Sequence, residues 1–257
     1  MVLLETRQLM KHFGGIMAVN DISLSIGKGE ILGMIGPNGS GKSTFVNLLT
    51  GIYTPDKGQT LFKDRDITRL PVHRITEFGI ARTFQNLRVF QNISVMTNIL
   101  IGRHSQIKNS LWEIYLRPFS VWKREKAARE KAMEFLELAH LTDRGNELAK
   151  NLPYGEQRLL EICRALASEP ELLLLDEPCA GMNPVEMDTL AEFIQRIQAS
   201  GTTVFIIEHN MRFIMSVAER IVVLNMGKKY KEGSPLEIQS DSGVQSIYLG
   251  EEEDSDA

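Results

Sequence analysis

Near its N-terminus the chain alternates apolar and polar residues. From Leu3 to Leu24 the segments LLETRQL and AVNDISLSI repeat this alternation on either side of Gly14-Gly15. A period of two residues is typical of strands with one buried face, and a glycine pair between two such runs is typical of a connecting loop. The pattern therefore predicts two antiparallel strands.

Further along, the apolar positions gather into short continuous runs. Each run is four or five residues long, and the first leads through glycines into a helical pattern that starts at Ser43. Runs of this length favour strands that are buried on both faces, and their alternation with helices indicates a parallel sheet. The runs are 31–35, 172–175 and 203–207, with 221–224 as a candidate fourth. In such sheets ligands bind beyond the carboxyl ends of the strands.

The pattern changes between Leu87 and Ser168, where strand-like runs vanish. Within Val121–Ala139 apolar residues recur at helical spacing among charges. We therefore predict a helical subdomain, 87–168, inserted into an α/β core made of 1–86 and 169–250. The final segment EEEDSDA, 251–257, contains five acidic residues and no apolar residue larger than alanine, which predicts a disordered acidic tail.

Composition narrows the class of protein. The chain has 257 residues, of which 43% are hydrophobic and 24% charged, values that suit a folded core rather than intrinsic disorder. The formal net charge of −4 gives no support to nucleic-acid binding by bulk charge. Only two cysteines are present, which favours a reducing compartment. No run of 18 apolar residues occurs, so we expect no membrane-spanning segment.

The segment after the first apolar run is a phosphate-binding motif. GPNGSGKS fits G-x-x-x-x-G-K-[ST] and stands between a predicted strand and a predicted helix. Glycines let successive backbone N–H groups face a phosphate, the lysine supplies a mobile cation, and Ser43 is placed to hold Mg²⁺. The predicted nucleotide-binding residues here are Gly36, Pro37, Asn38, Gly39, Ser40, Gly41, Lys42, Ser43 and Thr44.

Two carboxylates follow the second apolar run. Asp176 ends a predicted buried strand and is expected to hold Mg²⁺ through water, whereas Glu177 can accept a proton from attacking water. A polar strand end before a helix is the common structural interpretation of such a pair. The phosphate loop in the same chain favours the functional interpretation instead.

These and further motifs resemble the ATP-binding subunits of ATP-binding-cassette (ABC) transporters, and the matches follow the family order along nearly the whole chain. Gln85 in RTFQN resembles the Q-loop, LPYGEQ at 152–157 the signature, AGMN at 180–183 the D-loop, and His209 the switch histidine. The resemblance implies a P-loop NTPase core with a parallel sheet, an N-terminal antiparallel β-subdomain and an inserted helical subdomain.

The resemblance also implies roles for individual residues. Phe13 would stack on adenine, although a core phenylalanine on a strand edge remains an alternative. Gln85 would contact Mg²⁺ or the attacking water, and His209 would bind the γ-phosphate and orient that water. Glu177, His209, Gln85 and Lys42 are thus the predicted catalytic residues, and Ser43, Gln85 and Asp176 the predicted metal ligands.

The signature departs from the usual L-S-G-G-Q. Pro153 and Tyr154 replace its serine and first glycine, so contact with a γ-phosphate would rest on Tyr154, Gly155 and Glu156 and on backbone N–H groups. With Tyr-Gly at this position, the signature resembles that of the branch of the family that imports branched-chain amino acids. Asn183 stands where the D-loop usually has aspartate.

Partners follow from the same resemblance. The signature acts on the nucleotide of a second cassette, so the chain is expected to dimerise, with itself or a related cassette. Two integral membrane permease subunits and, indirectly, a solute-binding protein complete an importer, with this chain peripheral on the cytoplasmic face of the plasma membrane. The apolar stretch after Gln85 suits a groove for a permease helix or, equally, internal packing. Cassettes for urea or amide import, for lipopolysaccharide export, or for soluble non-transport work remain alternatives; no nucleic acid is expected.

Overall fold

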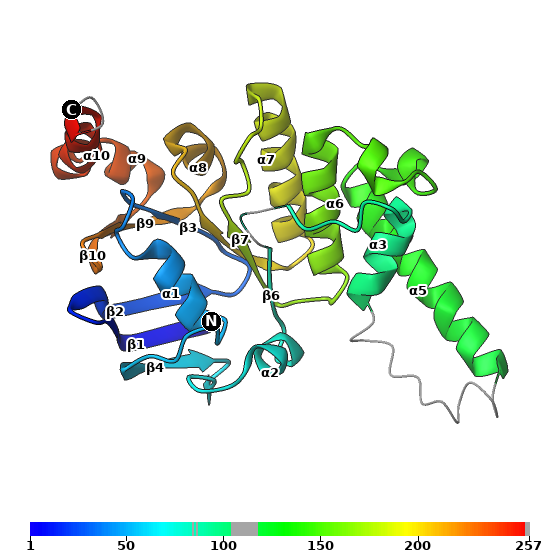
Figure 1. The fold of residues 1–257 in the computed structure, drawn as a ribbon, viewed down its shortest axis with the longest axis horizontal. Coiled ribbons are helices and arrows are strands. Elements are labelled where there is room, and N and C mark those ends of the chain that lie inside the picture. The colour runs from blue at the N-terminus through cyan, green and yellow to red at the C-terminus, as the bar shows by residue number, and fades with distance from the viewer. Residues whose placement is uncertain (84, 86, 104–117, 255–257) are drawn as a thin grey trace.

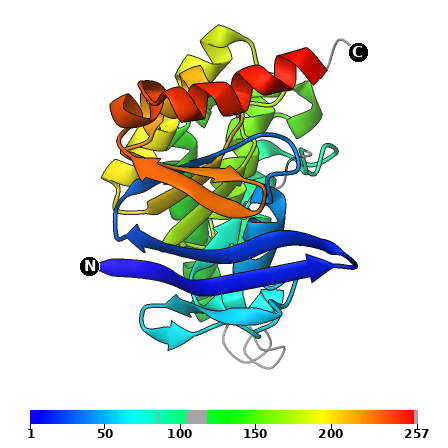
Figure 2. The same ribbon diagram turned by 90° about the vertical axis from the view of Figure 1, so that its left-hand side faces the viewer.

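The computed structural model describes residues 1–83, 85, 87–103 and 118–254. Its N-terminal part is a four-stranded antiparallel sheet of order β2-β1-β4-β5. The long hairpin of this sheet is the predicted pair of strands, with Phe13 and Ile16 opposite each other at its end. The strands are β1 (Val2–Phe13), β2 (Ile16–Gly27), β4 (Lys57–Phe62) and β5 (Arg65–Asp66). Figure 2 shows β1, β2 and β4 of this sheet one above another across the lower half of the view.

The second sheet carries the predicted parallel strands. Its order is β10-β9-β3-β8-β7-β6, and every neighbouring pair is parallel except β10 with β9. The pairing of Ile35 with Val223 and of Asp176 with Ile207 brings the carboxyl ends of four strands to one edge. The strands are β3 (Ile31–Ile35), β6 (Ile80–Arg82), β7 (Leu172–Asp176), β8 (Thr203–Ile207), β9 (Arg220–Asn225) and β10 (Lys228–Gly233).

Two hydrophobic clusters lie on the two faces of this sheet. In β3 the side chains of Leu32 and Met34 join the cluster that contains α1 (Lys42–Leu49), whereas Ile31 and Ile35 join the cluster on the opposite face. Alternate residues of a strand point to opposite faces, which is why a run apolar at every position is needed here. Figure 1 shows α1 between the two sheets. The remaining core helices are α2 (Val72–Glu77), α7 (Pro184–Ala199) and α8 (Met211–Val217).

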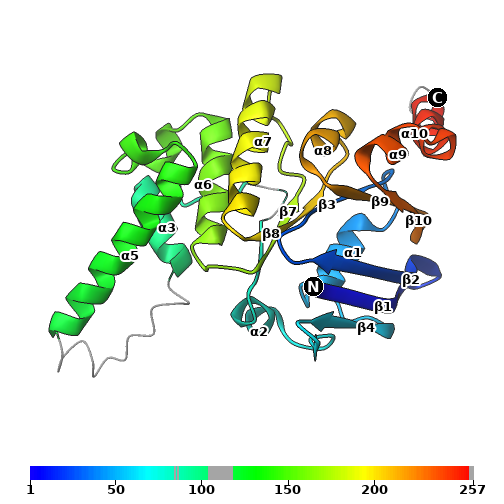
Figure 3. The ribbon, with the colours of Figure 1, turned by 180° about the vertical axis from the view of Figure 1, so that it is seen from behind.

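Helices replace strands in the predicted inserted region. It contains α3 (Val95–Gly102), α5 (Pro118–Leu138), α6 (Tyr154–Leu166) and two short 3₁₀ turns, η2 (Thr142–Arg144) and η3 (Ala149–Asn151). The stripe predicted in 121–139 is confirmed, because Ala132 and Leu136 of α5 are fully buried. Figures 1 and 3 show α3, α5 and α6 grouped at one end of the molecule. We keep 87–168 as the proposed extent of this subdomain.

The C-terminal segment differs from the sequence prediction. After α9 (Pro235–Gln239), helix α10 runs from Ser242 to Asp254 and so includes four residues of the tail that we predicted to be disordered. Val244, which is buried, anchors the helix. Glutamate is a good helix former, and extending an existing helix adds a hydrogen bond for each residue fixed. Residues 255–257 lie outside the described residues. No described helix has the length and apolarity needed to cross a membrane.

Candidate functional site

The phosphate-binding motif forms a loop between β3 and α1. The Lys42 side chain is nearly buried, and its Nζ donates hydrogen bonds to the carbonyl oxygens of Gly36 (2.6 Å) and Pro37 (2.9 Å). These two bonds fold the ammonium group over the loop. Because α1 begins at Lys42, the positive end of its dipole points at the same place.

Two glycines of the loop are required by its geometry. Gly36 and Gly41 have φ values of +153° and +101°. A Cβ atom at either position would lie 2.2 Å from a carbonyl oxygen, that of Leu224 for Gly36 and that of Ala18 for Gly41. Any side chain would therefore push the loop away from the hairpin and from β9.

A cavity of about 400 Å³ opens over this loop. It is lined by Ile16, Met17, Ala18, Asn38, Gly39, Ser40, Gly41, Lys42, Ser43, Thr44, Glu177, Met226 and Gly227. Most of the predicted nucleotide-binding residues thus meet Glu177 across one space. Phe13 is not among the lining residues; the residue is 42% exposed, and its ring lies edge-on to that of Tyr53, with centroids 5.2 Å apart. Stacking of Phe13 on adenine stays a prediction.

Asp176 lies at the end of β7 and is nearly buried. Its Oδ2 accepts a hydrogen bond of 2.7 Å from a guanidinium nitrogen of Arg82, the last residue of β6. Arg82 also donates to Asn47 on α1, at 2.7 Å. A buried carboxylate needs such a partner, because an unpaired charge away from water is costly. The sequence pattern did not single out Arg82.

Glu177, Gln85 and His209 converge at the same sheet edge. The Nε2 atom of Gln85 donates to Oε2 of Glu177 at 2.8 Å, and Nδ1 of His209 lies 3.9 Å from that oxygen. Glu177 has φ of +47°, and its N–H donates to the Ile207 carbonyl oxygen at 2.9 Å. Left-handed backbone at a non-glycine residue costs about 1–3 kcal/mol and is typical of functional sites. The structure thus brings three predicted catalytic residues together, and one of them, Glu177, shares the cavity with Lys42.

Glu208 is a site residue that the sequence analysis missed. Its side chain is fully buried and accepts three backbone hydrogen bonds, from the N–H groups of Cys179 (2.9 Å), His209 (3.1 Å) and Asn210 (3.2 Å). It thereby joins the loop after Glu177 to the loop that carries the switch histidine. Burial, together with the Glu208 charge, raises the pKa of the Cys179 thiol, and burial raises that of Cys163.

Glu208→Ala is expected to destabilise the chain strongly. The change leaves the buried Cys179 N–H and the partly buried His209 and Asn210 N–H groups without acceptors. An unsatisfied buried donor costs about 1–3 kcal/mol, so the free energy of unfolding should fall by more than about 1 kcal/mol. Glu208→Gln keeps one acceptor oxygen and should lose less. Urea unfolding of the two variants and the parent measures this; an alanine variant within about 1 kcal/mol of the parent would contradict the structural role.

The signature residues lie at the N-terminus of α6, away from the cavity lining. Pro153 is the N-cap residue and makes no side-chain cap bond. The Tyr154 hydroxyl donates to the Ala180 carbonyl oxygen at 2.9 Å, and the Gly155 N–H donates to Oε1 of Glu186 at 3.3 Å. The signature is therefore tied to the loop and helix that follow Glu177. Glu156, half-buried, lies 3.8 Å from Arg144.

Two of the residues predicted to hold Mg²⁺, Ser43 and Asp176, carry oxygen donors at the start of α1 and the end of β7. Mg²⁺ binds oxygen ligands: usually one or two carboxylates, together with water and the phosphate oxygens of a substrate. Ser43 lines the cavity, and Asp176 presents a carboxylate whose Oδ2 pairs with Arg82. The described residues contain no cluster of three His, Cys, Asp or Glu side chains suited to a metal. The donor set thus fits an ion held largely by nucleotide and water.

Comparison with known proteins supplies independent information. Residues 19–180 match a protein-family model described as ABC transporter. The high-affinity branched-chain amino acid transport ATP-binding protein LivG of Salmonella typhimurium is 40% identical over 97% of this chain and 98% of its own. The corresponding protein BraF of Pseudomonas aeruginosa is 38% identical with the same coverage.

Solved structures agree with the sequence relatives. An ATP-binding cassette of an ABC transporter, solved in its ADP conformation, superposes with a TM-score of 0.86 at 32% identity, covering 97% of this chain and 99% of its own. A dimeric bacterial ABC transporter cassette superposes with a TM-score of 0.75 at 23% identity, covering 91% and 99%. The second likeness shows the fold alone.

Proposed function

Because the chain belongs to the ABC transporter family and is an ATPase of the ATP-binding-cassette type, we propose that it energises the uptake of branched-chain amino acids. The observation that carries the cargo is near full-length similarity to LivG and BraF, both named for branched-chain amino acid transport. The Pro153-Tyr154 variant of the signature, which resembles that of the branched-chain amino acid importers, supports the same cargo.

The geometry supports hydrolysis by direct attack of water on the γ-phosphoryl group. Lys42 binds the β- and γ-phosphates, Glu177 accepts the proton of the attacking water, and His209 orients that water. Gln85, which donates to Glu177, holds its carboxylate toward the cavity. Mg²⁺, when bound through Ser43 and Asp176, supplies positive charge to the phosphate oxygens. No side chain needs to form a phosphoenzyme.

We propose that the working unit is a dimer of cassettes, of identical or related chains. The support is that Tyr154, Gly155 and Glu156 do not line the cavity that Lys42 and Glu177 share. A chain with one phosphate loop and one signature then needs a partner's signature to complete its site. This chain in turn offers its own to the partner.

A second cavity supports a membrane partner. It measures about 480 Å³ and lies between the segment after Gln85 and the helices α3 and α6. Apolar side chains on its rim are exposed, including Phe90 (49%) and Ile101 (43%). We propose that a short helix of one permease subunit docks here, that a second permease subunit docks in the same way on the partner cassette, and that the cassettes lie on the cytoplasmic face of the membrane. A solute-binding protein would join indirectly, through the permeases.

Purification of the tagged chain from solubilised membranes, with mass spectrometry of its partners, tests the assignment. Hydrophobic permease subunits should co-purify, and cells that lack the chain should lose uptake of radiolabelled leucine. Ribosomal components, with normal leucine uptake, would favour a soluble cassette ATPase. Permeases accompanied by loss of urea uptake alone would move the cargo to another transporter.

Ile101→Glu is expected to abolish permease co-purification while leaving the ATPase rate of the isolated chain unchanged. The carboxylate places an unpaired charge in the contact that we propose to be buried, which costs several kcal/mol. Leu236→Glu, on α9 and 77% exposed, is the matched control and should retain the permeases. Equal recovery with both variants would exclude this groove as the docking site.

A further inference from the structure

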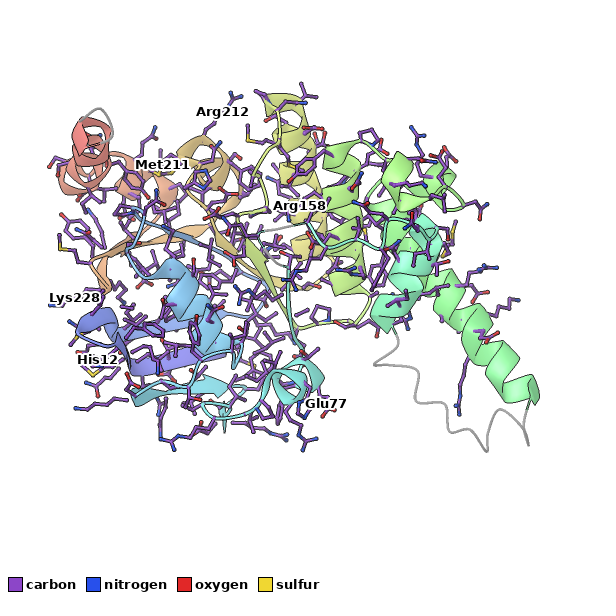
Figure 4. All side chains as sticks on the ribbon, viewed as in Figure 1. His12, Glu77, Arg158, Met211, Arg212 and Lys228 are labelled. Atoms are coloured by element: carbon purple, nitrogen blue, oxygen red, sulfur yellow. The ribbon has the colours of Figure 1, made fainter. Side chains whose placement is uncertain are left out.

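A buried ion pair outside the catalytic set lies on the signature helix. Arg158 and Glu161, both on α6, are 0% and 2% exposed, and one guanidinium nitrogen of Arg158 lies 2.7 Å from Oε2 of Glu161. Arg158, labelled in Figure 4, lies in the interior where α6 meets the core. It is also among the largest fully buried side chains of the described residues.

Both members of the pair also bind the Q-loop backbone. The second guanidinium nitrogen of Arg158 donates to the Gln85 carbonyl oxygen at 2.9 Å. On the other side, Oε1 of Glu161 accepts from the Arg88 N–H at 3.0 Å. The ion pair therefore holds the chain at Gln85 and again three residues later, with charge-assisted bonds that are roughly twice as strong as neutral ones.

The side chain of Gln85 continues the same series of contacts. Its amide donates to the Glu177 carboxylate at 2.8 Å, so backbone and side chain of one residue bridge the signature helix and the catalytic glutamate. Among the contacts of the described residues, this is a direct connection between α6 and the carboxylate that accepts a proton from water.

The stability of the fold alone does not require this ion pair. Burial raises the pKa of Glu161, and this effect outweighs the opposing effect of Arg158 beside it. Apolar residues of similar volume often stabilise a protein as well as a buried ion pair does. What apolar residues cannot supply is a pair of polar contacts that fix a neighbouring backbone.

We propose that Arg158 and Glu161 are positioning residues that set Gln85 against Glu177 and make this contact depend on the position of the signature helix. The inference rests on the proposed function. Tyr154 and Gly155, at the start of α6, are those expected to meet the partner's nucleotide. Displacement of α6 on dimer formation would then reach the chain's own catalytic carboxylate through Arg158 and Gln85.

The test compares steady-state ATP hydrolysis by the full chain, by Arg158→Met/Glu161→Leu and by Arg158→Lys. The apolar double variant avoids a lone buried charge, and it should lose about 100-fold in kcat, the cost of a small misplacement, with KM for ATP unchanged. Arg158→Lys keeps the ion pair but loses the forked geometry, so its loss should be smaller. Arg129→Met, on the exposed face of α5, is the control and should match the parent.

A cycle with Gln85→Ala separates positioning from general destabilisation. If Arg158 and Glu161 act through Gln85, their replacement should change kcat little in the Gln85→Ala background. Full turnover of the double variant, or an equal fold-loss in both backgrounds, would overturn the inference. A parallel rise in KM with a lower melting temperature would assign the pair a structural role only. Absence of ATPase activity in the parent would instead count against the proposed function.

Discussion

Glu177→Gln should lower the rate of ATP hydrolysis by about 10²–10⁴-fold, the usual contribution of a general base. The amide keeps the size and can still pair with Gln85, but it cannot accept the proton of the attacking water. ATP affinity should be retained, because Lys42 and the loop amides hold the phosphates without Glu177. With hydrolysis blocked, ATP should accumulate in a closed dimer, measurable by size-exclusion chromatography with light scattering.

Glu125→Gln is a matched control for this change. Glu125 is exposed on α5 and does not line the cavity, so its variant should hydrolyse ATP at the parental rate. Unimpaired turnover of Glu177→Gln would show that Glu177 is not the general base and would contradict the proposed attack geometry.

Lys42→Ala should weaken ATP binding itself. The ammonium group supplies charge-assisted hydrogen bonds to phosphate, each contributing about 1.5–3 kcal/mol, so Kd should rise by about 10–100-fold for the loss of one such bond. Its present bonds to the carbonyl oxygens of Gly36 and Pro37 show that the group reaches over the loop. Isothermal titration calorimetry with ATP and with ADP measures the change.

Lys150→Ala serves as the control for Lys42→Ala, since Lys150 is exposed in η3 and does not line the cavity. Its ATP affinity should equal that of the parent. Equal affinities for Lys42→Ala and the parent would remove Lys42 from the phosphate site.

Sequence reasoning located the parts of the fold that depend on strong local patterns. The strands at 31–35 and 203–207 were predicted to the residue, because a parallel strand buried on both faces is apolar at nearly every position. The loop at Gly36 was equally visible, since positive φ and close backbone approach restrict its residues. Strand β10, KKYKEG, was missed because an edge strand needs no apolar face.

The supporting polar contacts could not be predicted in the same way. The Arg82–Asp176 bond joins residues 94 positions apart, and the Arg158–Gln85 bond joins residues 73 apart. No local periodicity encodes such pairs, because they depend on which strands and helices become neighbours. Glu208 stood next to the predicted histidine, and its place at the end of a buried strand was the available signal.

Both cysteines are unpaired and buried, and burial raises the pKa of each thiol, so both should remain protonated and slow to alkylate at neutral pH. A cysteine introduced on the exposed face of α5 or α9 should therefore react alone with a maleimide dye or a nitroxide. The native cysteines then do not react with the label, so spectroscopic distance measurements can use the native chain. Distances between α5 and α9 become measurable during turnover without first removing Cys163 or Cys179.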